Sequence, residues 1–158
     1  MDPDPRARFT PANRDELKAA VDAYIAGDQD QDRSHGPIGT WDTSRVTDMS
    51  RLFEKHREFN EDISNWDTSN VTDMRGMFIG ALSFNQPINT HTVTRDDGTT
   101  YTAWDTSNVT NMGRMFDGAT AMLSKLPHLK SRDPVGTPDV DDWKADMYPR
   151  DKLFLKFK

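Results

Sequence analysis

Residues 66–78 read WDTSNVTDMRGMF, and nearly the same thirteen residues occur twice more in the chain. The other copies are WDTSRVTDMSRLF at residues 41–53 and WDTSNVTNMGRMF at residues 104–116. Trp41 and Trp66 are 25 residues apart, whereas Trp66 and Trp104 are 38 apart, which is one repeat plus 13 further residues. Self-similarity at a fixed period is typical of repeat proteins, so the chain is expected to contain three similar units in tandem.

The three units also place apolar residues at matching positions. The matching sets are Ile38, Ile63 and Tyr101; Val46, Val71 and Val109; Met49, Met74 and Met112; Leu52, Met77 and Met115; Phe53, Phe78 and Phe116; and Phe59, Phe84 and Met122. A single unit of this size is too small to enclose a core. Side-by-side packing of three units is therefore expected to bury one continuous column of Trp, Val, Met and Phe side chains.

The spacing within a unit predicts a short strand. Ile63, Trp66 and Thr68 follow the pattern I-x-x-W-x-T, which is similar to the strand of a leucine-rich repeat. Strands from successive units would form a parallel sheet, with the Trp and Thr side chains pointing to the core.

The residues after this strand predict a helix of two to three turns. Val71, Met74, Met77 and Phe78 recur at intervals of three and four, which is typical of a helix. Ser69 is expected to cap its N-terminus. Glycine is expected to end the helices in the left-handed conformation, at Gly80 and Gly118.

A further helix is predicted before the first unit, over residues 13–26. Its apolar residues again fall at intervals of three and four. Asn13 is a suitable N-cap with Glu16 three residues later, and Gly27 is a suitable C-terminal stop. Because terminal units of a repeat array need an apolar cover, this helix is expected to cap the array.

The phrase W-D-T-S-x-V-T-D-M-x-x-M-F, followed in the second unit by SFNQPI, resembles the repeats of the BspA-like leucine-rich-repeat surface-protein family. The resemblance covers residues 38–123. It implies adhesion or protein binding, and a secreted or cell-surface location, for most members. The first residues, MDPDPRARF, lack the apolar run of a signal peptide, so the compartment is left open.

These observations predict an α/β fold, a short leucine-rich-repeat-like β/α solenoid with three repeats, an N-terminal capping helix and a C-terminal cap. Residues 1–37 would form the N-terminal tail, capping helix and linker. Residues 38–129 would form the three-repeat solenoid, and residues 130–158 the C-terminal extension. In that extension Trp143, Met147 and Tyr148 are expected to pack on the last unit.

The insertion between the second and third units, at residues 89–103, is predicted to be a β-hairpin. Threonines and other strand-forming residues, among them Val93 and Tyr101, flank an Asp97-Gly98 turn, which is a strong hairpin signal. The hairpin is interpreted either as a structural decoration or as a binding loop, since insertions in repeat proteins often lie on the binding face.

The composition argues against several classes of partner. The chain has 20 Lys and Arg against 26 Asp and Glu, for a net charge of -6, so nucleic acid is not expected as a partner. It has no Cys, which excludes disulfides and thiolate sites. No stretch approaches the roughly 18 apolar residues of a membrane span, so no membrane insertion is expected.

Patterns typical of catalysis and metal binding are missing from the sequence. It contains no phosphate-binding glycine loop, no H-E-x-x-H and no G-x-S-x-G. Asp28, Asp30 and Asp32 lack the glycine turn and distal glutamate of a calcium loop. The four histidines are dispersed, at His35, His56, His91 and His128. We therefore expect no enzymatic activity, no cofactor and no metal site.

Asp42, Asp67 and Asp105 occupy the same position in the three units and are expected to form a row. Like charges at strand spacing repel by about 1 kcal/mol per pair in water-like surroundings, so the row needs compensation. Either the carboxylates accept backbone N–H bonds at the following turn, or they form an acidic strip for a basic partner or a divalent cation.

The sequence thus favours a non-enzymatic protein-binding module that uses the exposed strand face and the hairpin insertion. The candidate partner-binding residues are Asp42, Ser44, Asp67, Ser69, Asp105, Ser107, Val93 and Tyr101. Two alternatives stay open. One is a structural subunit that assembles with itself or a larger complex through residues 150–158, and the other is a cell-surface adhesion module.

Overall fold

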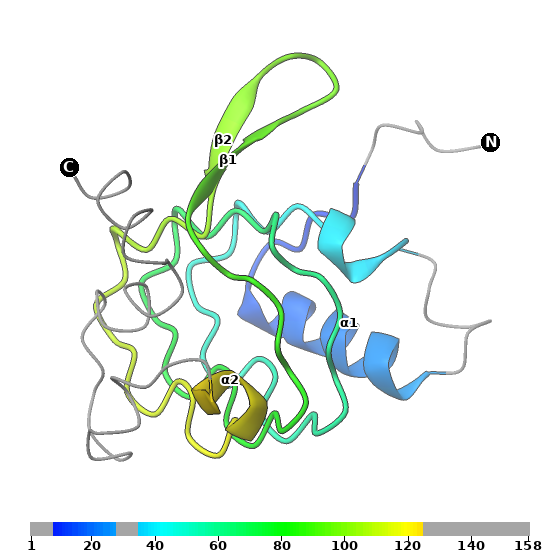
Figure 1. Ribbon diagram of the computed structural model, residues 1–158. Coiled ribbons are helices and arrows are strands. Elements are labelled where there is room, and N and C mark those ends of the chain that lie inside the picture. The colour runs from blue at the N-terminus through cyan, green and yellow to red at the C-terminus, as the bar shows by residue number, and fades with distance from the viewer. Residues whose placement is uncertain (1–7, 28–34, 125–158) are drawn as a thin grey trace.

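The computed structural model describes residues 8–27 and 35–124. These residues contain two α-helices, one two-stranded antiparallel sheet and a buried aromatic core (Figure 1). In chain order the elements are α1 (Arg14–Ala26), the 3-10 turn η1 (Ile38–Thr40), β1 (His91–Thr94), β2 (Thr100–Ala103) and α2 (Thr120–Ser124). The predictions for Asp28, Asp30 and Asp32 and for residues 130–158 lie outside the described residues.

Helix α1 confirms the prediction for residues 13–26. The side chain of Asn13 accepts a 3.0 Å hydrogen bond from the backbone N–H of Glu16, which is the expected N-cap. The helix ends at Gly27, whose backbone is extended (φ -69°) and not left-handed. Leu17 and Val21 on one face are completely buried, so α1 is an amphipathic helix that covers the array.

The strand predicted at the start of each unit is not present. The described residues form regular strands only at β1 and β2. Around Trp66 the backbone instead makes turns, since the N–H of Trp66 bonds to Ile63 and that of Val71 bonds to Thr68. These local bonds occupy backbone N–H groups that, in a strand, would be available to bond to an adjacent strand.

The helix predicted over residues 71–78 is also absent, because the backbone N–H groups bond to the next unit. Met74 donates to the carbonyl of Asn111 at 2.8 Å, and Phe78 donates to that of Met115 at 2.9 Å. An α-helix would direct these N–H groups four residues back along its own chain. Gly76 and Gly80 have φ values of +62° and +67°, which interrupt helical geometry, so Gly80 closes a turn and ends no helix.

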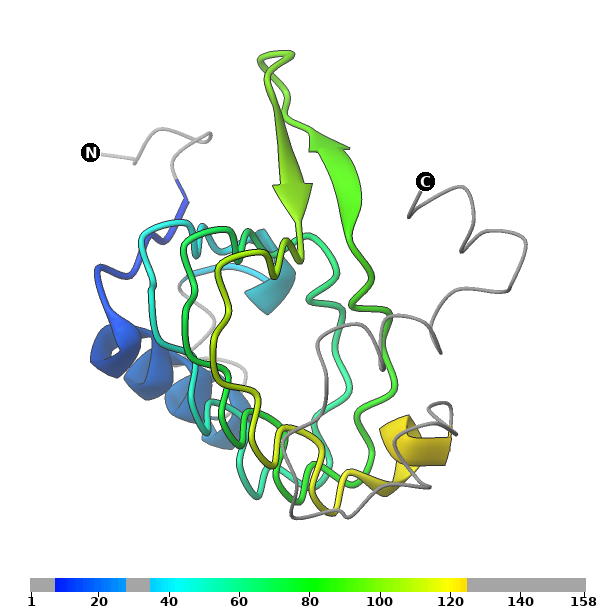
Figure 2. The ribbon, with the colours of Figure 1, turned by 90° about the vertical axis from the view of Figure 1, so that its left-hand side faces the viewer.

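Bonds of this kind join all three units, and we call them the inter-unit ladder. They connect every second residue at 2.7–2.9 Å, with isolated parallel bridges at Asp48–Asp73 and Asp73–Asn111. The donors of unit 1 are Met49, Arg51, Phe53 and Lys55, and their acceptors in unit 2 are Asp73, Arg75, Met77 and Ile79. The units therefore lie side by side in parallel register (Figure 2), but the described residues form no β/α solenoid.

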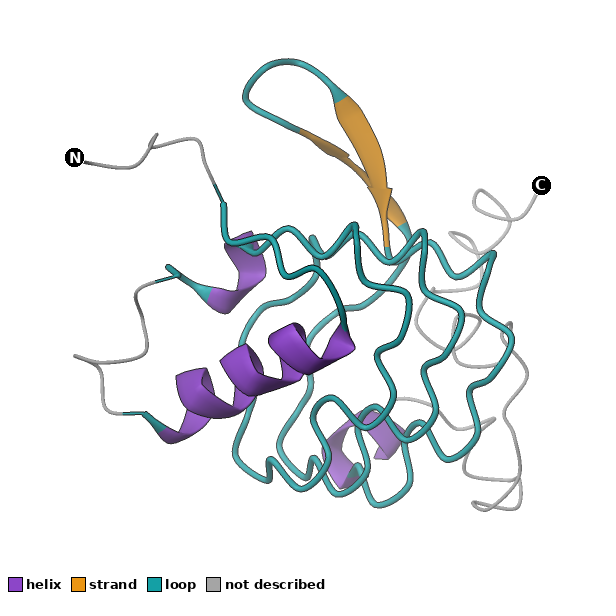
Figure 3. Ribbon diagram, turned by 180° about the vertical axis from the view of Figure 1, so that it is seen from behind, coloured by secondary structure: helices purple, strands orange, loops and turns teal. Residues whose placement is uncertain are grey.

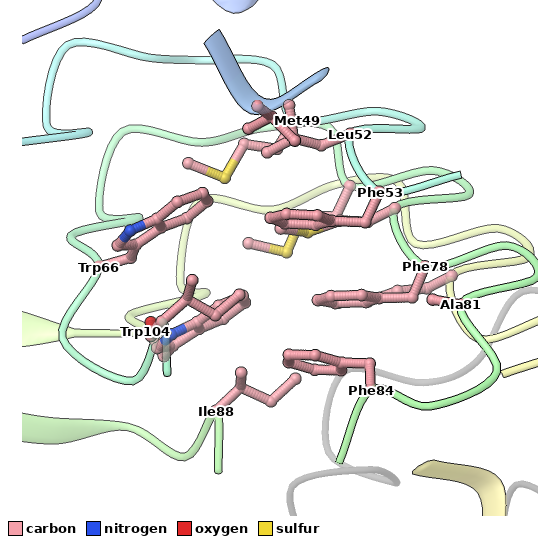
Figure 4. Close-up of a cluster of buried hydrophobic side chains, with 14 of the residues drawn as sticks. Met49, Leu52, Phe53, Trp66, Phe78, Ala81, Phe84, Ile88 and Trp104 are labelled. Carbon is pink, nitrogen blue, oxygen red and sulfur yellow. Dashed lines mark hydrogen bonds between the residues drawn. The ribbon is translucent and has the colours of Figure 1, made fainter. Parts of the chain in front are cut away.

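The predicted core is confirmed for every matched apolar position except Tyr101, which is only partly buried. The aromatic rings of Phe53, Phe78 and Phe116 form one continuous stack. Successive centroids lie 5.5 and 5.7 Å apart, with interplanar angles of 5° and 1°. Trp66 and Trp104 lie beside them and are completely buried (Figure 4). One aromatic core thus runs through all three units, as the repeated positions required.

Helix α1 covers the unit 1 end of this core (Figure 3). Tyr24 packs edge-on against Trp41, with ring centroids 5.5 Å apart. Two cationic side chains of α1 reach the ladder, because Arg14 Nε donates to the carbonyl of Ser50 at 2.8 Å and Lys18 Nζ donates to that of Leu52 at 3.1 Å. The helix therefore supplies both apolar cover and hydrogen-bond donors to the first unit.

Candidate functional site

The predicted hairpin is confirmed. β1 and β2 pair antiparallel, and the turn between them contains Gly98 with φ +87°, a conformation that glycine adopts without strain. The N–H of Arg95 bonds to the carbonyl of Thr99 at 2.7 Å and closes the turn. In Figures 1 and 2 the hairpin projects from the rim of the array between units 2 and 3.

The base of the hairpin is fastened to unit 2. The hydroxyl of Tyr101 donates to the carbonyl of Asn65 at 2.5 Å, and His91 Nε2 pairs with the side-chain oxygen of Asn65 at 3.1 Å. Thr90 Oγ1 donates to the carbonyl of Trp104 at 2.7 Å. Sequence reasoning missed Asn65, since nothing in its neighbourhood in the chain connects it to an insertion that begins 24 residues later.

The two faces of the hairpin differ in burial. Val93 and Tyr101 are cross-strand partners, are partly buried and pack against the core. The guanidinium of Arg95 lies 4.3 Å from the centre of the Tyr101 ring. The exposed face carries two cross-strand threonine pairs, Thr92–Thr102 and Thr94–Thr100. The predicted contact residues thus face inward, and the threonines that sequence reasoning missed face solvent.

The aspartates of the predicted row accept backbone hydrogen bonds. Oδ1 of Asp42, Asp67 and Asp105 accepts the N–H of the serine two residues later at 3.0, 3.0 and 2.9 Å. These bonds agree with the first interpretation of the row, in which the carboxylates accept backbone N–H bonds at the following turn. Each carboxylate has a second oxygen, and all three residues are partly exposed. The row therefore has a structural role and still presents negative charge at the surface.

The serines beside the row take part in contacts between units. The side-chain amide of Asn70 donates to the carbonyl of Ser44, and that of Asn108 donates to the carbonyl of Ser69, both at 2.7 Å. Ser44 and Ser69 are partly exposed, and Ser107 in the last unit is exposed. The predicted strand face is thus a surface of turns, whose spacing is fixed by these amide bonds.

The hairpin base lies beside the row, because Asn65, which accepts the Tyr101 hydroxyl, is two residues before Asp67, and Asp105 follows the end of β2 by two residues. Burial raises the pKa of the Tyr101 hydroxyl. The positive charges of Arg8 and Arg95 act to lower this pKa, and the negative charges of Asp67 and Asp42 act to raise it. At the hairpin tip, hydrogen bonds from the hydroxyl and N–H of Thr99 lower the pKa of Asp97. The hairpin and the aspartate row therefore belong to one surface, which we call the hairpin–row surface.

Within residues 8–27 and 35–124, no group of three or more His, Asp or Glu side chains is arranged to hold a metal ion. No helix in this part of the chain is long and apolar enough to cross a bilayer. The partly buried histidines have protein partners, since His56 Nε2 lies 2.7 Å from Asp22 and His91 pairs with Asn65.

Comparison with known proteins gives a family and no activity. Neither a curated protein nor a solved structure matches the chain. A family model matches residues 26–130, about two thirds of the chain, which include all three units and the hairpin. The chain therefore belongs to the family described as Mycoplasma protein of unknown function, DUF285.

Proposed function

We propose that this protein is a non-enzymatic protein-binding module that contacts its partner through the hairpin–row surface. The observation that carries the proposal is the hairpin, which projects from the array yet is fastened at its base to Asn65 and Trp104. A segment that served only to join two units would need neither the projection nor the exposed threonine pairs.

The anchoring matters because binding a loose loop costs conformational entropy. Each immobilised side chain costs about 0.5–1.5 kcal/mol at an interface, and ordering the backbone adds to that. The cross-strand register and the Asn65 bonds impose this order before any partner arrives. The hairpin can therefore present its threonines at little additional cost.

The chemistry of the surface indicates the kind of partner. The threonine hydroxyls can donate and accept hydrogen bonds, and the aspartate row adds negative charge at the hairpin base. The chain as a whole carries a net charge of -6. A protein surface with Lys or Arg side chains would complement the row and gain in association rate from the opposite charge.

We also propose that the three units are a short relative of BspA-like leucine-rich repeats, arranged as a solenoid of turns. The repeated W-D-T-S-x-V-T-D-M phrase and the parallel inter-unit ladder support this relationship. Cell-surface adhesion, which the resemblance implies for many members, is one setting in which a protein-binding surface of this kind would work.

The experiment compares two full-length variants, each with two added lysines. Thr94→Lys/Thr100→Lys alters the hairpin face. Ser83→Lys/Thr120→Lys alters two exposed positions, one in α2 and one next to Leu82, whose carbonyl accepts the N–H of Ala121 in α2. Helix α2 lies on the side away from the hairpin (Figure 1). Affinity capture on the parent chain is followed by measurement of Kd with each purified candidate.

A partner of the hairpin–row surface should bind the parent and the α2-side variant equally, and the hairpin variant at least tenfold more weakly. The proposal fails if every captured protein binds all three chains alike.

A further inference from the structure

The hairpin has an outer edge on each strand that no third strand covers in the part of the chain that the structure describes. The sheet there consists of β1 and β2, paired antiparallel. In an antiparallel pair, residues alternate between those that bond to the opposite strand and those whose N–H and C=O groups point away from it. Each outer edge of the hairpin therefore carries a set of outward backbone groups.

Two hydrogen bonds fix which residues of β2 point outward. Near the tip, the N–H of Arg95 bonds to the carbonyl of Thr99 at 2.7 Å, so this pair faces inward. At the base, the N–H of Trp104 bonds to the carbonyl of Trp66 in unit 2 at 3.1 Å, and so points away from β1. Both bonds give the same alternation, in which even-numbered residues point outward. The outer edge of β2 thus offers the N–H and C=O groups of Thr100 and Thr102.

The edge of β2 has few of the features that discourage pairing with another strand. Its residues, Thr100–Ala103, include no proline and no charged side chain. Lysine, proline or a bulge in an edge strand usually prevents unwanted pairing. In Figures 1 and 2 the hairpin also projects beyond the rim of the units. Because β2 has only four residues, backbone bonds alone would hold a partner weakly, and a specific partner needs further contacts.

The aspartate row lies at the base of this same edge. The bond from Trp104 to Trp66 joins the edge to unit 2, and Asp105 and Asp67 directly follow these two tryptophans. Both aspartates are partly exposed, and the serine N–H that each accepts engages one carboxylate oxygen, Oδ1. A strand that lay along β2 and continued past its base would therefore meet carboxylates. The outer edge of β1 lies on the opposite side of the hairpin, away from Trp66.

The charges favour a basic partner over a second copy of this chain. The tip of the hairpin carries Asp96 and Asp97, and its base lies beside the row. Antiparallel pairing of two β2 edges would bring the tip of one copy to the row of the other, and parallel pairing would bring the two rows together. Either arrangement places aspartates next to aspartates, which repel. Arg8 and Arg95 act on Tyr101 nearby but are outnumbered by these aspartates.

We propose that the partner protein adds an extended, basic strand to the outer edge of β2. The backbone of that strand bonds to Thr100 and Thr102, and its lysine or arginine side chains beyond the hairpin base pair with the aspartate row. In strand addition, main-chain bonds give affinity and side chains give specificity. The inference rests on the proposed protein-binding function and specifies how the partner is held.

The first test uses two proline variants of the full chain that alter opposite edges of the hairpin. Thr102→Pro removes an outward N–H from β2, and Thr92→Pro removes the equivalent N–H from β1, while the bonds between the strands are kept. Thr92 and Thr102 are cross-strand partners, so both variants lose a threonine side chain from the same exposed face. The probe is a peptide of about six residues with blocked termini and alternating lysine and valine. Its control has glutamate in place of lysine.

The lysine peptide should bind the parent and Thr92→Pro with the same Kd, and Thr102→Pro about tenfold more weakly or worse. The glutamate peptide should bind the parent about tenfold more weakly or worse. Equal weakening in the two proline variants would overturn strand addition but leave the proposed function standing, because it would indicate recognition of the threonine face. A parent chain that does not bind the lysine peptide would also overturn strand addition.

The second test does not depend on the folding of any variant. In amide hydrogen exchange of the parent chain, saturating lysine peptide should slow exchange at Thr100 and Thr102 by on the order of tenfold. Exchange at Thr92 and Thr94, on the edge of β1, should not change. Equal slowing at all four residues, or at none of them, would contradict the proposal. Slowing at Thr100 and Thr102 that grows with protein concentration without peptide would also overturn it, because a second copy would then occupy the edge.

Discussion

The carbonyl oxygen of Asn65 in unit 2 accepts a 2.5 Å hydrogen bond from the hydroxyl of Tyr101 in β2. The side chain of the same Asn65 pairs with His91 in β1, so one residue holds both strands of the hairpin. The orientation of the hairpin relative to the array therefore depends on these two contacts, together with the bond from Thr90 to Trp104.

Removal of the Tyr101 hydroxyl should loosen the hairpin and leave the core intact. For Tyr101→Phe we expect faster amide exchange across β1 and β2 and a loss of about 1 kcal/mol in the free energy of unfolding, as for one hydrogen bond. Tyr24→Phe is the matched control, since Tyr24 bonds to Glu61 at 2.6 Å and lies in α1. It should leave hairpin exchange unchanged. Equal exchange in parent and Tyr101→Phe would show that the hydroxyl does not anchor the hairpin.

The structural role of the aspartate row can be separated from its charge at Asp67. Asp67→Ala removes the acceptor of the Ser69 N–H and should cost about 1 kcal/mol in unfolding free energy. Asp67→Asn keeps an acceptor oxygen and should cost less than half as much, since Asn111 already makes the equivalent bond to Gly113 at 3.0 Å. Equal losses in the two variants would contradict this assignment.

The same variants test cation binding by the row. Since the carboxylates are engaged with serine N–H groups, calcium should change the Tm of the parent and of Asp67→Asn by the same amount. A rise in Tm confined to the parent would instead support a cation site.

The core could be predicted from the sequence because a repeat fixes which residues face inward. The positions of Val71, Met74, Met77 and Phe78 are apolar in all three units, with Leu52 matching Met77 in unit 1. Residues at the same position share one environment whatever the backbone conformation is. Tyr101 departs from this rule because it also belongs to β2, and the hairpin carries it to the edge of the core.

The secondary structure could not be predicted in the same way. Consecutive turns of four residues place left-handed residues at Gly76 and Gly80 in unit 2 and at Arg51 and Lys55 in unit 1. The four-residue period of these turns is close to the 3.6 residues of a helical turn. The same apolar spacing is therefore compatible with a helix and with consecutive turns. The choice between helix and turns is made by hydrogen bonds between units, and the sequence of a single unit contains no pattern that predicts them. Glycine occupies both left-handed positions only in unit 2, whereas the first of these positions is Arg51 in unit 1 and Arg114 in unit 3.

The hairpin shows a similar limit at the candidate site. Asp97-Gly98 identifies the turn, and alternation along the strands separates Val93 and Tyr101 from the threonines. Alternation does not say which of the two faces lies against the body of the protein. That depends on Asn65 and on the core of unit 2, which the local pattern does not contain.

Gly39 should be the glycine least tolerant of substitution by alanine. A Cβ at this position would lie 2.4 Å from the carbonyl oxygen of Asp62, and a backbone atom cannot move away cheaply. We expect Gly39→Ala to cost about 2 kcal/mol or more in unfolding free energy, measured by urea denaturation.

Gly98→Ala is the comparison for this prediction. Nothing lies within 4 Å of a Cβ at Gly98, so its cost comes from the positive φ alone, about 1 kcal/mol or slightly more. A greater loss for Gly98→Ala than for Gly39→Ala would contradict the proposed clash with Asp62.

The contact between α1 and unit 1 should depend on pH through Asp22. Its carboxylate pairs with Lys18 at 2.8 Å and with His56 at 2.7 Å. Burial acts to raise the pKa of Asp22, but the hydrogen bonds and charges of Lys18 and His56 outweigh it and hold the pKa below its ordinary 3.8. A lowered pKa in the folded state means that the stabilisation is fully present above the unfolded pKa and is lost as pH falls through the folded one.

Asp22→Asn should therefore lower the free energy of unfolding at pH 7 but not in acid. The loss at pH 7 should be about 1 kcal/mol or less, because the Asp22 side chain is 47% exposed and solvent screens the pair. Asp15→Asn is the control, since that side chain is 96% exposed and lies 3.6 Å from Arg14. It should change stability little at either pH. Urea denaturation at pH 7 and near pH 2 checks both variants, and an equal loss for Asp22→Asn at the two pH values would show that the carboxylate charge does not hold α1 to unit 1.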